Sequence, residues 1–197
     1  MSELVEFDPL TGLPQRIEHF TILGLLGQGA MGFVFKARDE KFDSEVALKM
    51  IKPELASSQT SRERFLREAR ALGGVKHQNL VTVYQAFQDR GTVFLVMELL
   101  HGESLDARIH GLEPIELPEI LQIGWEIAEG LAALHAHGLI HRDIKPANIW
   151  LESPRNAERN PGPKRFQVKI LDLGLVRSVD EKDGLTATGM VMGTPAY

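Results

Sequence analysis

The pattern of apolar residues changes near residue 100. Before that point, one segment that opens at Ser61 and stops at Gly73 and Gly74 has apolar residues at helical spacing. The remaining apolar segments there are short and β-prone, at 20–26, 32–38, 45–51, 80–87 and 92–99. Beyond residue 100 the sequence predicts helices at 104–110 and 119–137 and short strands at 149–151 and 168–171. A β-rich half joined to a helical half predicts an α+β fold with two lobes.

The expected domain organisation follows from this change. Residues 1–18 are polar and rich in breakers, which predicts a loose N-terminal lead-in. We expect a first lobe at 19–98, and a joint with a second lobe at 99–197. The helix at 119–137 is expected to bury one apolar stripe, which consists of Ile120, Ile123, Ile127, Leu131 and Leu134.

Composition excludes several functional classes. Among 197 residues, 43% are hydrophobic and 25% are charged, and the net charge is −5 without a block of lysines and arginines. This argues against nucleic acid as a partner, because binding to phosphate backbones needs a basic footprint. The absence of cysteine excludes disulfides, zinc–thiolate sites and a cysteine nucleophile. No signal peptide or membrane-spanning run occurs in residues 1–197, so we expect a cytoplasmic domain.

The run His141–Asn148 carries the strongest chemical signal. It places an acid (Asp143), a cation (Lys145) and an amide (Asn148) at fixed offsets. Phosphoryl transfer depends mostly on positioning and charge neutralisation, and these three groups suit it. Asp143 would orient a substrate hydroxyl, Lys145 would face the transferred phosphate, and Asn148 would hold Mg²⁺. The alternative is a charged loop without chemistry.

A glycine pattern lies near the start of the β-rich half. Gly27, Gly29 and Gly32 form G-x-G-x-x-G, followed by Phe33 and Val34. Tight turns also use glycine, so the pattern alone is weak evidence. A dinucleotide-binding fold needs a helix after the last glycine, whereas residues 33–37 are strand-like. The glycines therefore predict a hairpin that folds over phosphates.

A lysine suited to phosphate binding follows, together with a glutamate that could pair with it. On a strand, Ala47 and Lys49 point to the same face, so a small residue could lie under a base while an ammonium reaches phosphates. Glu68 lies 19 residues after Lys49 within the predicted helix and could pair with it. A surface lysine is the alternative for Lys49, and Glu63 is the alternative partner.

The last element is Asp172, which follows the predicted strand at 168–171 and precedes Leu173 and Gly174. An acid at a strand end can reach a metal that bridges nucleotide phosphates. Taken alone, the same residues could form a simple Asx or type I turn.

These five elements occur once each and in one order, and in that order the chain resembles a eukaryotic-like serine/threonine protein kinase domain of the type found in bacteria. The resemblance covers about residues 20–197 and stops within the activation segment. It implies a bilobal fold, with a five-stranded antiparallel small lobe, one main helix and an incomplete helical large lobe.

The resemblance also implies cofactors and roles. ATP and Mg²⁺ (or Mn²⁺) are expected, with protein serine or threonine hydroxyls as acceptors, including those of a second copy in trans. It assigns phosphate binding to Lys49 supported by Glu68, the catalytic base to Asp143 and γ-phosphate contact to Lys145. The glycines would cover the phosphates, and Asn148 and Asp172 would bind metal. The implied adenine site consists of Val34, Ala47, Met97, Glu98, Leu100 and Trp150.

Regulation is expected through the activation segment. Arg142 precedes the base and is the cation that a phosphorylated segment would engage. Thr186 and Thr188 offer hydroxyls at the corresponding place, so the resemblance predicts autophosphorylation there. Thr194 resembles the substrate-loop threonine of the family.

Four features depart from the family pattern. Leu173 replaces a phenylalanine, and Trp150 replaces a small aliphatic residue, so Trp150 either stacks on adenine or fills core while Ile149 or Leu151 faces the base. The stretch 152–167 reads as an inserted solvated loop. The chain ends at Tyr197, and we expect residues 1–197 alone to be weakly active or inactive.

Two other functional classes remain as alternatives at this stage. A pseudokinase would keep the fold and bind nucleotide or act as a scaffold, although such proteins usually lose the lysine, the base or the metal-binding acid. A small-molecule kinase would share the fold, but the segment around Thr186, Thr188 and Thr194 favours a protein substrate.

Overall fold

The computed structural model describes residues 14–29, 31–153, 166–171 and 177–178. These residues form two compact units. The first contains the described residues up to 73 together with 83–99, and the second contains 74–82 and the described residues from 100 onward. No helix within the described residues is long and apolar enough to cross a membrane.

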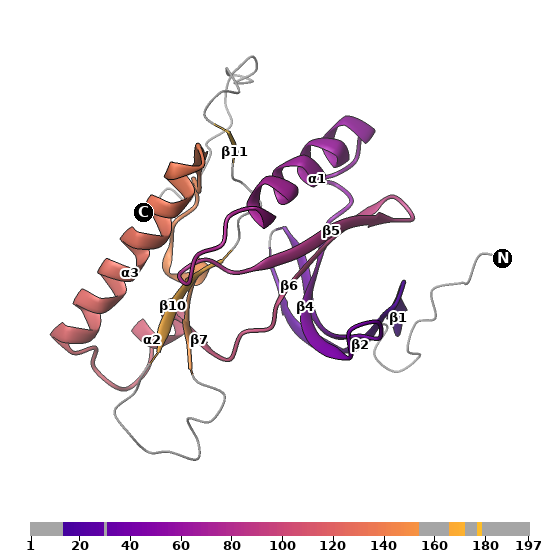
Figure 1. Ribbon diagram of the computed structural model, residues 1–197. Helices are drawn as coiled ribbons and strands as arrows, with labels where there is room; N and C mark the ends of the chain where they lie inside the picture. The colour runs from indigo at the N-terminus through magenta and orange to yellow at the C-terminus, as the bar shows by residue number, and fades with distance from the viewer. Residues whose placement is uncertain (1–13, 30, 154–165, 172–176, 179–197) are drawn as a thin grey trace. The chain divides into compact units, whose positions relative to one another are not determined.

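The first unit is built on a six-stranded antiparallel sheet in the order β1-β2-β3-β4-β6-β5 (Figure 1). Five of its strands match the segments expected from sequence, and the α+β class is confirmed. The sixth lies inside the expected lead-in. The strands are β1 (Arg16–Ile17), β2 (Phe20–Gln28), β3 (Gly32–Asp39), β4 (Ser44–Ile51), β5 (Val83–Asp89) and β6 (Thr92–Glu98).

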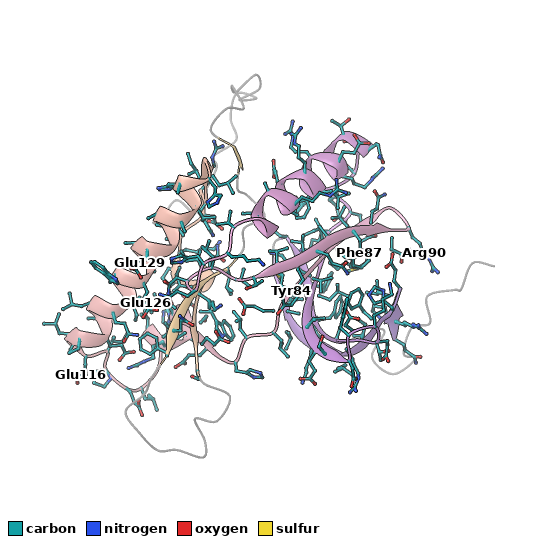
Figure 2. The ribbon with its side chains drawn as sticks, in the orientation of Figure 1. Tyr84, Phe87, Arg90, Glu116, Glu126 and Glu129 are labelled. Carbon is teal, nitrogen blue, oxygen red and sulfur yellow. The ribbon has the colours of Figure 1, made fainter. Side chains whose placement is uncertain are left out.

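Side-chain alternation gives this sheet two apolar faces. Phe35, Leu48 and Val96 belong to the core on one face, where the rings of Phe20, Phe87 and Phe94 stack. Ile17 of β1 joins this core and is 4% exposed, which explains why so short a strand forms. Tyr84 and Phe87 both come from β5 (Figure 2).

Helix α1 (Gln59–Gly73) covers the opposite face of the sheet. Its Phe65 and Leu66 pack against a second cluster that contains Ile51 and Val93. The helix lies over β5 and β6 in Figure 1. Since Ile51 and Lys49 are two residues apart on β4, they share a face, and α1 therefore lies on the face that carries Lys49.

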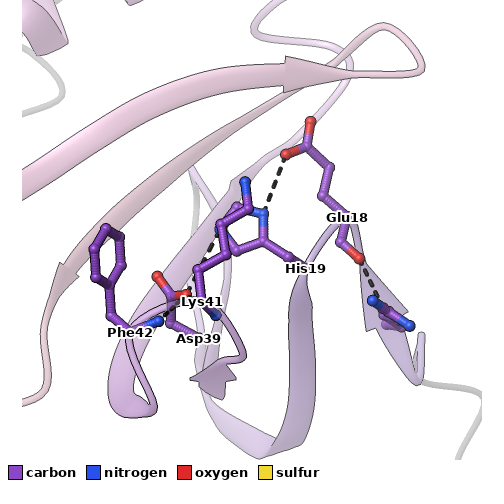
Figure 3. A network of polar contacts seen from close by, with 6 residues as sticks. Glu18, His19, Asp39, Lys41 and Phe42 are labelled. Carbon is purple, nitrogen blue, oxygen red and sulfur yellow. Dashed lines mark hydrogen bonds and ion pairs between the residues drawn. The ribbon is translucent and has the colours of Figure 1, made fainter.

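A polar network joins the β1–β2 turn to the β3–β4 turn at one end of the strands of the first sheet (Figure 3). Asp39 is 5% exposed, and its Oδ1 accepts hydrogen bonds from the backbone N–H groups of Lys41 (2.9 Å) and Phe42 (3.2 Å). The ring of His19 lies 3.7 Å from Oδ1 of Asp39 and 3.7 Å from the carboxylate of Glu18. The carboxylate of Asp39 thus satisfies the donors of the β3–β4 turn.

The second unit combines helices with short strands. Its sheet β10-β9-β7 consists of β10 (Gln167–Ile170), β9 (Ile149–Glu152) and β7 (Gly102–Ser104), and a second sheet pairs β8 (Leu139–Ile140) with β11 (Arg177–Ser178). The helices are α2 (Leu105–Ile109), α3 (Leu117–Ala136) and a 3₁₀ turn, η1 (Pro146–Asn148).

Residues 80–82 differ from the expected strand 80–87, because the strand begins at Val83. The preceding backbone bonds instead to β10: Val81 N–H donates to Ile170 O (3.0 Å) and Ile170 N–H donates to Asn79 O (2.9 Å). Leu80 and Ile170 form an isolated parallel bridge. This pairing explains why 74–82 belongs to the second unit.

Helix α3 anchors this segment through Glu126, which lies near Glu129 on the same helix (Figure 2). Oε2 of Glu126 accepts from Asn79 Nδ2 (3.0 Å) and from Val168 N–H (2.7 Å). The expected apolar stripe is only partly right: Ile123 and Leu134 are buried, but Ile120 is 52% exposed. On the same helix, the buried Gly130 lies against Asn79 and Ile170.

Candidate active site

The chemistry-bearing residues fall in both units. The first unit holds the glycine hairpin, Lys49 and Glu68, and the second holds the loop 141–148 and Trp150. Asp172, Thr186, Thr188 and Thr194, together with Leu173, lie outside the described residues.

In the first unit, strand register gathers one set of expected residues on one face. Val34 pairs with Lys49, Lys49 with Leu95, and Ala47 with Met97. Directly paired residues of an antiparallel sheet point to the same side, so Val34, Ala47, Lys49 and Met97 share a face. This is the face that α1 covers, and Glu68 is a half-buried residue of α1.

Lys49 is the unusual titratable group of this unit. Its residue is 6% exposed, and burial lowers the pKa of its ammonium from 10.5 to about 8. A buried lysine with a lowered pKa regains its charge readily when an anion approaches, which suits a phosphate ligand.

The three glycines have different structural reasons. A Cβ at Gly32 would lie 1.8 Å from the carbonyl oxygen of Met50, so β3 and β4 can meet there only if residue 32 is glycine. A Cβ at Gly27 or at Gly29 would meet nothing within 4 Å. The hairpin is closed by Gly29 N–H donating to Gly32 O (2.9 Å). Nothing in the described fold requires glycine at 27 or 29.

In the second unit, the loop 141–148 holds its acid between two donors. The carboxylate Oδ2 of Asp143 lies 2.9 Å from Nζ of Lys145 and accepts from Nδ2 of Asn148 at 3.0 Å. Asn148 Nδ2 also donates to the backbone oxygen of Asp143 (2.8 Å). Asp143 and Asn148 are buried, whereas Lys145 is half-buried. The loop therefore presents an oriented carboxylate whose negative charge is stabilised on one side.

The ring of His141 links this loop to the backbone at Leu171. Its Nδ1 accepts from Asp143 N–H (3.3 Å), so the ring proton resides on Nε2, which donates to Leu171 O (2.7 Å). Burial lowers the pKa of His141, although the hydrogen bond to Leu171 opposes this. The neutral imidazole is the form that fits both hydrogen bonds.

Arg142 is exposed between the buried residues His141 and Asp143. Its φ is +65°, a left-handed conformation that is uncommon for a residue with a side chain. This turn of the backbone lets His141 and Asp143 both point inward while Arg142 is exposed. Such local strain is typical of functional loops.

Two antiparallel ladders lie on either side of the loop 141–148. β9 pairs with β10 from Ile149↔Ile170 to Glu152↔Gln167, and β8 pairs with β11 at Ile140↔Arg177 and Leu139↔Ser178. Leu171 N–H also donates to Asn148 O (2.8 Å). Sequence reasoning did not identify Leu171, because it acts through its backbone and its side chain carries no signal.

Of the two residues expected to hold a divalent metal, Asn148 lies within the described residues and Asp172 lies outside them. The amide nitrogen of Asn148 is committed to Asp143, which leaves the amide oxygen as the end of the side chain suited to a hard cation such as Mg²⁺. The described residues contain no cluster of three or more acidic or histidine residues able to bind a metal. Asn148 fits the metal role assigned to it, and Asp172 would have to supply the charge.

Comparison with known proteins identifies the family. The model of the protein kinase domain matches residues 20–197. The chain belongs to the protein kinase domain family. This confirms the resemblance deduced from the order of the motifs.

Several relatives are named serine/threonine-protein kinases. The chain is 34% identical to pkn3 of Myxococcus xanthus over 182 residues, which is 90% of this chain and 32% of that protein. It is 33% identical to PknF of Mycobacterium tuberculosis, with coverage of 90% and 36%, respectively. The human kinase ULK1 is 38% identical over 90% of this chain and 16% of its own length. The chain spans about a third of the length of these two bacterial relatives.

A solved structure supports the fold. The crystal structure of the Mycobacterium tuberculosis PknI kinase domain matches with a TM-score of 0.67 and 25% identity, over 81% of this chain and 61% of that chain. The protein-kinase-like fold is therefore confirmed for this part of the domain.

Proposed function

We propose that the protein transfers the γ-phosphoryl group of ATP to serine or threonine hydroxyls of proteins, and that it acts in the cytoplasm. The observation that carries the proposal is the carboxylate of Asp143, held between Lys145 Nζ and Asn148 Nδ2 in a loop that His141 anchors. The names of the relatives support this chemistry.

The described residues divide the work between them. Asp143 orients the substrate hydroxyl and accepts its proton as the new P–O bond forms and the bond from the γ-phosphoryl group to the departing ADP breaks, while Lys145 neutralises charge on the transferred phosphoryl group. Lys49, supported by Glu68, contacts the α- and β-phosphates, and the glycine hairpin covers them. When bound, Mg²⁺ at Asn148 and Asp172 neutralises phosphate charge.

The base-binding residues of this proposal are Val34, Ala47, Met97, Glu98, Leu100 and Trp150. In the first unit, the shared sheet face of Val34, Ala47 and Met97 supports this assignment. Leu100 and Trp150 belong to the second unit and are half-buried.

Self-activation is the regulatory part of the proposal. Arg142 is exposed in a fixed backbone conformation and would bind a phosphate attached to Thr186 or Thr188, with Thr194 positioning the substrate. A second copy of the chain would act as substrate in trans.

The test is intact-mass spectrometry of the full-length protein before and after incubation with Mg²⁺ and ATP. We expect added phosphates that map to Thr186 or Thr188, and none on the Asp143→Asn variant. Added phosphates on both proteins would remove Asp143 from the reaction. A parent that binds ATP without any transfer, to itself or to a general protein substrate, would instead indicate the pseudokinase alternative.

A further inference from the structure

The structure gives Trp150 a contact that the sequence did not predict. On β9, Ile149 and Leu151 are buried at 1% and 3% exposure, and Trp150 lies between them on the opposite face, half-buried. Its indole Nε1–H donates to the backbone oxygen of His101 at 3.1 Å. The ring is therefore held at its nitrogen edge.

The backbone around His101 is closely tied to β9. The oxygen of His101 accepts a second hydrogen bond, from Ser153 N–H at 2.9 Å. At the next residue, Gly102, φ is +118° and a Cβ would lie 2.1 Å from Leu151 O, so this approach of β7 to β9 requires glycine.

The same strand then leads into a capped helix. Ser104 pairs with Trp150 across the ladder, and its Oγ accepts from Ala107 N–H (3.1 Å) at the start of α2. Trp150 thus pairs with Ser104 of β7 along the ladder and bonds through its indole to His101, the residue just before β7. Between them, these contacts fix the peptide plane at residue 101.

We propose that Trp150 is a positioning residue for recognition of the nucleotide base. Its indole N–H fixes the carbonyl of His101, and with it the direction of the chain immediately after Glu98–Leu100. The inference rests on the proposed function, in which Glu98 and Leu100 are base-binding residues, and it takes their backbone groups as those that bond to adenine. A fixed backbone offers its donors and acceptors in one order, which matches the edge of adenine and mismatches that of guanine.

The loss of this hydrogen bond should therefore change base recognition more than chemistry. In Trp150→Phe the aromatic face remains and the N–H donor is lost. In the full-length protein we expect the KM for ATP to rise about three- to tenfold, the range that one net hydrogen bond supplies. The preference for ATP over GTP, as the ratio of kcat/KM values, should fall, and kcat should stay within about twofold.

Trp125 provides the matched control. It lies on α3 and is 69% exposed, so Trp125→Phe makes the same chemical change away from β7 and β9. We expect this variant to retain the parent KM and the parent preference for ATP. If Trp150→Phe matches Trp125→Phe in both quantities, the inference is wrong although the kinase activity stands. A parent that neither binds nor consumes ATP contradicts the proposed function itself.

A second measurement needs no substitution that could disturb folding. The indole N–H of Trp150 should exchange with solvent more slowly than that of Trp125, as observed by NMR on the ¹⁵N-labelled protein. Equal exchange of the two indole protons would show that the bond to His101 does not persist, and would overturn the inference.

Discussion

The side-chain amide of Asn148 donates to both the backbone oxygen (2.8 Å) and the carboxylate (3.0 Å) of Asp143. One amide nitrogen thereby fixes the rotamer and the backbone of the proposed base. Because Asn148 is buried, water cannot replace this donor easily. The same two hydrogen bonds therefore fix both the carboxylate of Asp143 and the amide oxygen of Asn148, which is the end of the amide suited to a metal.

Replacement of Asn148 by leucine should therefore remove two functions while the number and branching of the side-chain heavy atoms are kept. We expect kcat to fall by about 10²- to 10⁴-fold, the range for loss of a positioned catalytic group. Steady-state kinetics with a protein substrate and a Mg²⁺ titration measure this. Ala147→Ser, at an exposed position of the same turn, should keep parent kinetics. An Asn148→Leu variant with parent kcat would contradict the assignment.

The glycine hairpin should separate folding from binding. Gly27→Ala and Gly29→Ala add a Cβ where the described structure has space, so we expect an unfolding midpoint close to that of the parent. If phosphates lie against this backbone, the same variants should raise the KM for ATP. Gly32→Ala should lower the midpoint, because its Cβ would overlap Met50 O. Thermal melts and ATP kinetics of the three variants test this, and equal melting losses would refute it.

Lys49 should take up a proton when nucleotide binds. Its pKa is about 8 in the free protein, so the lysine is about half protonated at pH 8, and phosphate oxyanions raise its pKa. Calorimetry of Mg²⁺–ATP binding at pH 8, in two buffers of different ionisation enthalpy, should show uptake of roughly half a proton. Lys49→Arg remains charged and should show none at this site.

The same group links stability to pH. The pKa of Lys49 lies below 10.5 in the folded protein, so the unfolded chain binds more protons between about pH 8 and 10.5. Its contribution to the unfolding free energy therefore rises with pH across that window. A parent-minus-Lys49→Arg difference that is flat with pH would contradict the lowered pKa.

Asp39 should be important for stability rather than for activity. Asp39→Ala leaves the N–H groups of Lys41 and Phe42 without their acceptor, and we expect a loss of about 1–3 kcal/mol in unfolding free energy. Asp43→Asn, in the same turn but exposed and paired only at the surface with Arg38, should change stability by less than about 0.5 kcal/mol. Urea titrations measure both. A loss for Asp43→Asn as large as that for Asp39→Ala would refute the argument.

Sequence reasoning succeeded where one local pattern determined the structure. Short, β-prone apolar segments predicted five strands of the first sheet, and helical spacing predicted α1 and α3 within two residues at each end. The family and fold followed from the order of the motifs. Strand β1 escaped detection because two residues carry no period, and Ile17 is recognisable only by its burial.

The misses concern partners distant in sequence. Val81 bonds to Ile170, 89 residues away, and this contact removes 80–82 from the expected strand. Ile120 was assigned to the buried stripe because helical periodicity predicts which residues share a face, but not how far along the helix other elements cover that face. The direction of the Trp150 indole depended on the carbonyl of His101, which no side-chain pattern reveals.

The ladders on either side of the loop 141–148 are unequal: four residue pairs join β9 to β10, and two join β8 to β11. The free energy of opening a ladder rises with the number of cooperative bonds that must break, so the shorter ladder is the one that opens first. The β8–β11 ladder is therefore the end that separates, and the β9–β10 ladder is the end that stays paired. A partner that competes for β11 would separate Arg177 and Ser178 from β8 while Asn148 and Leu171 remain bonded.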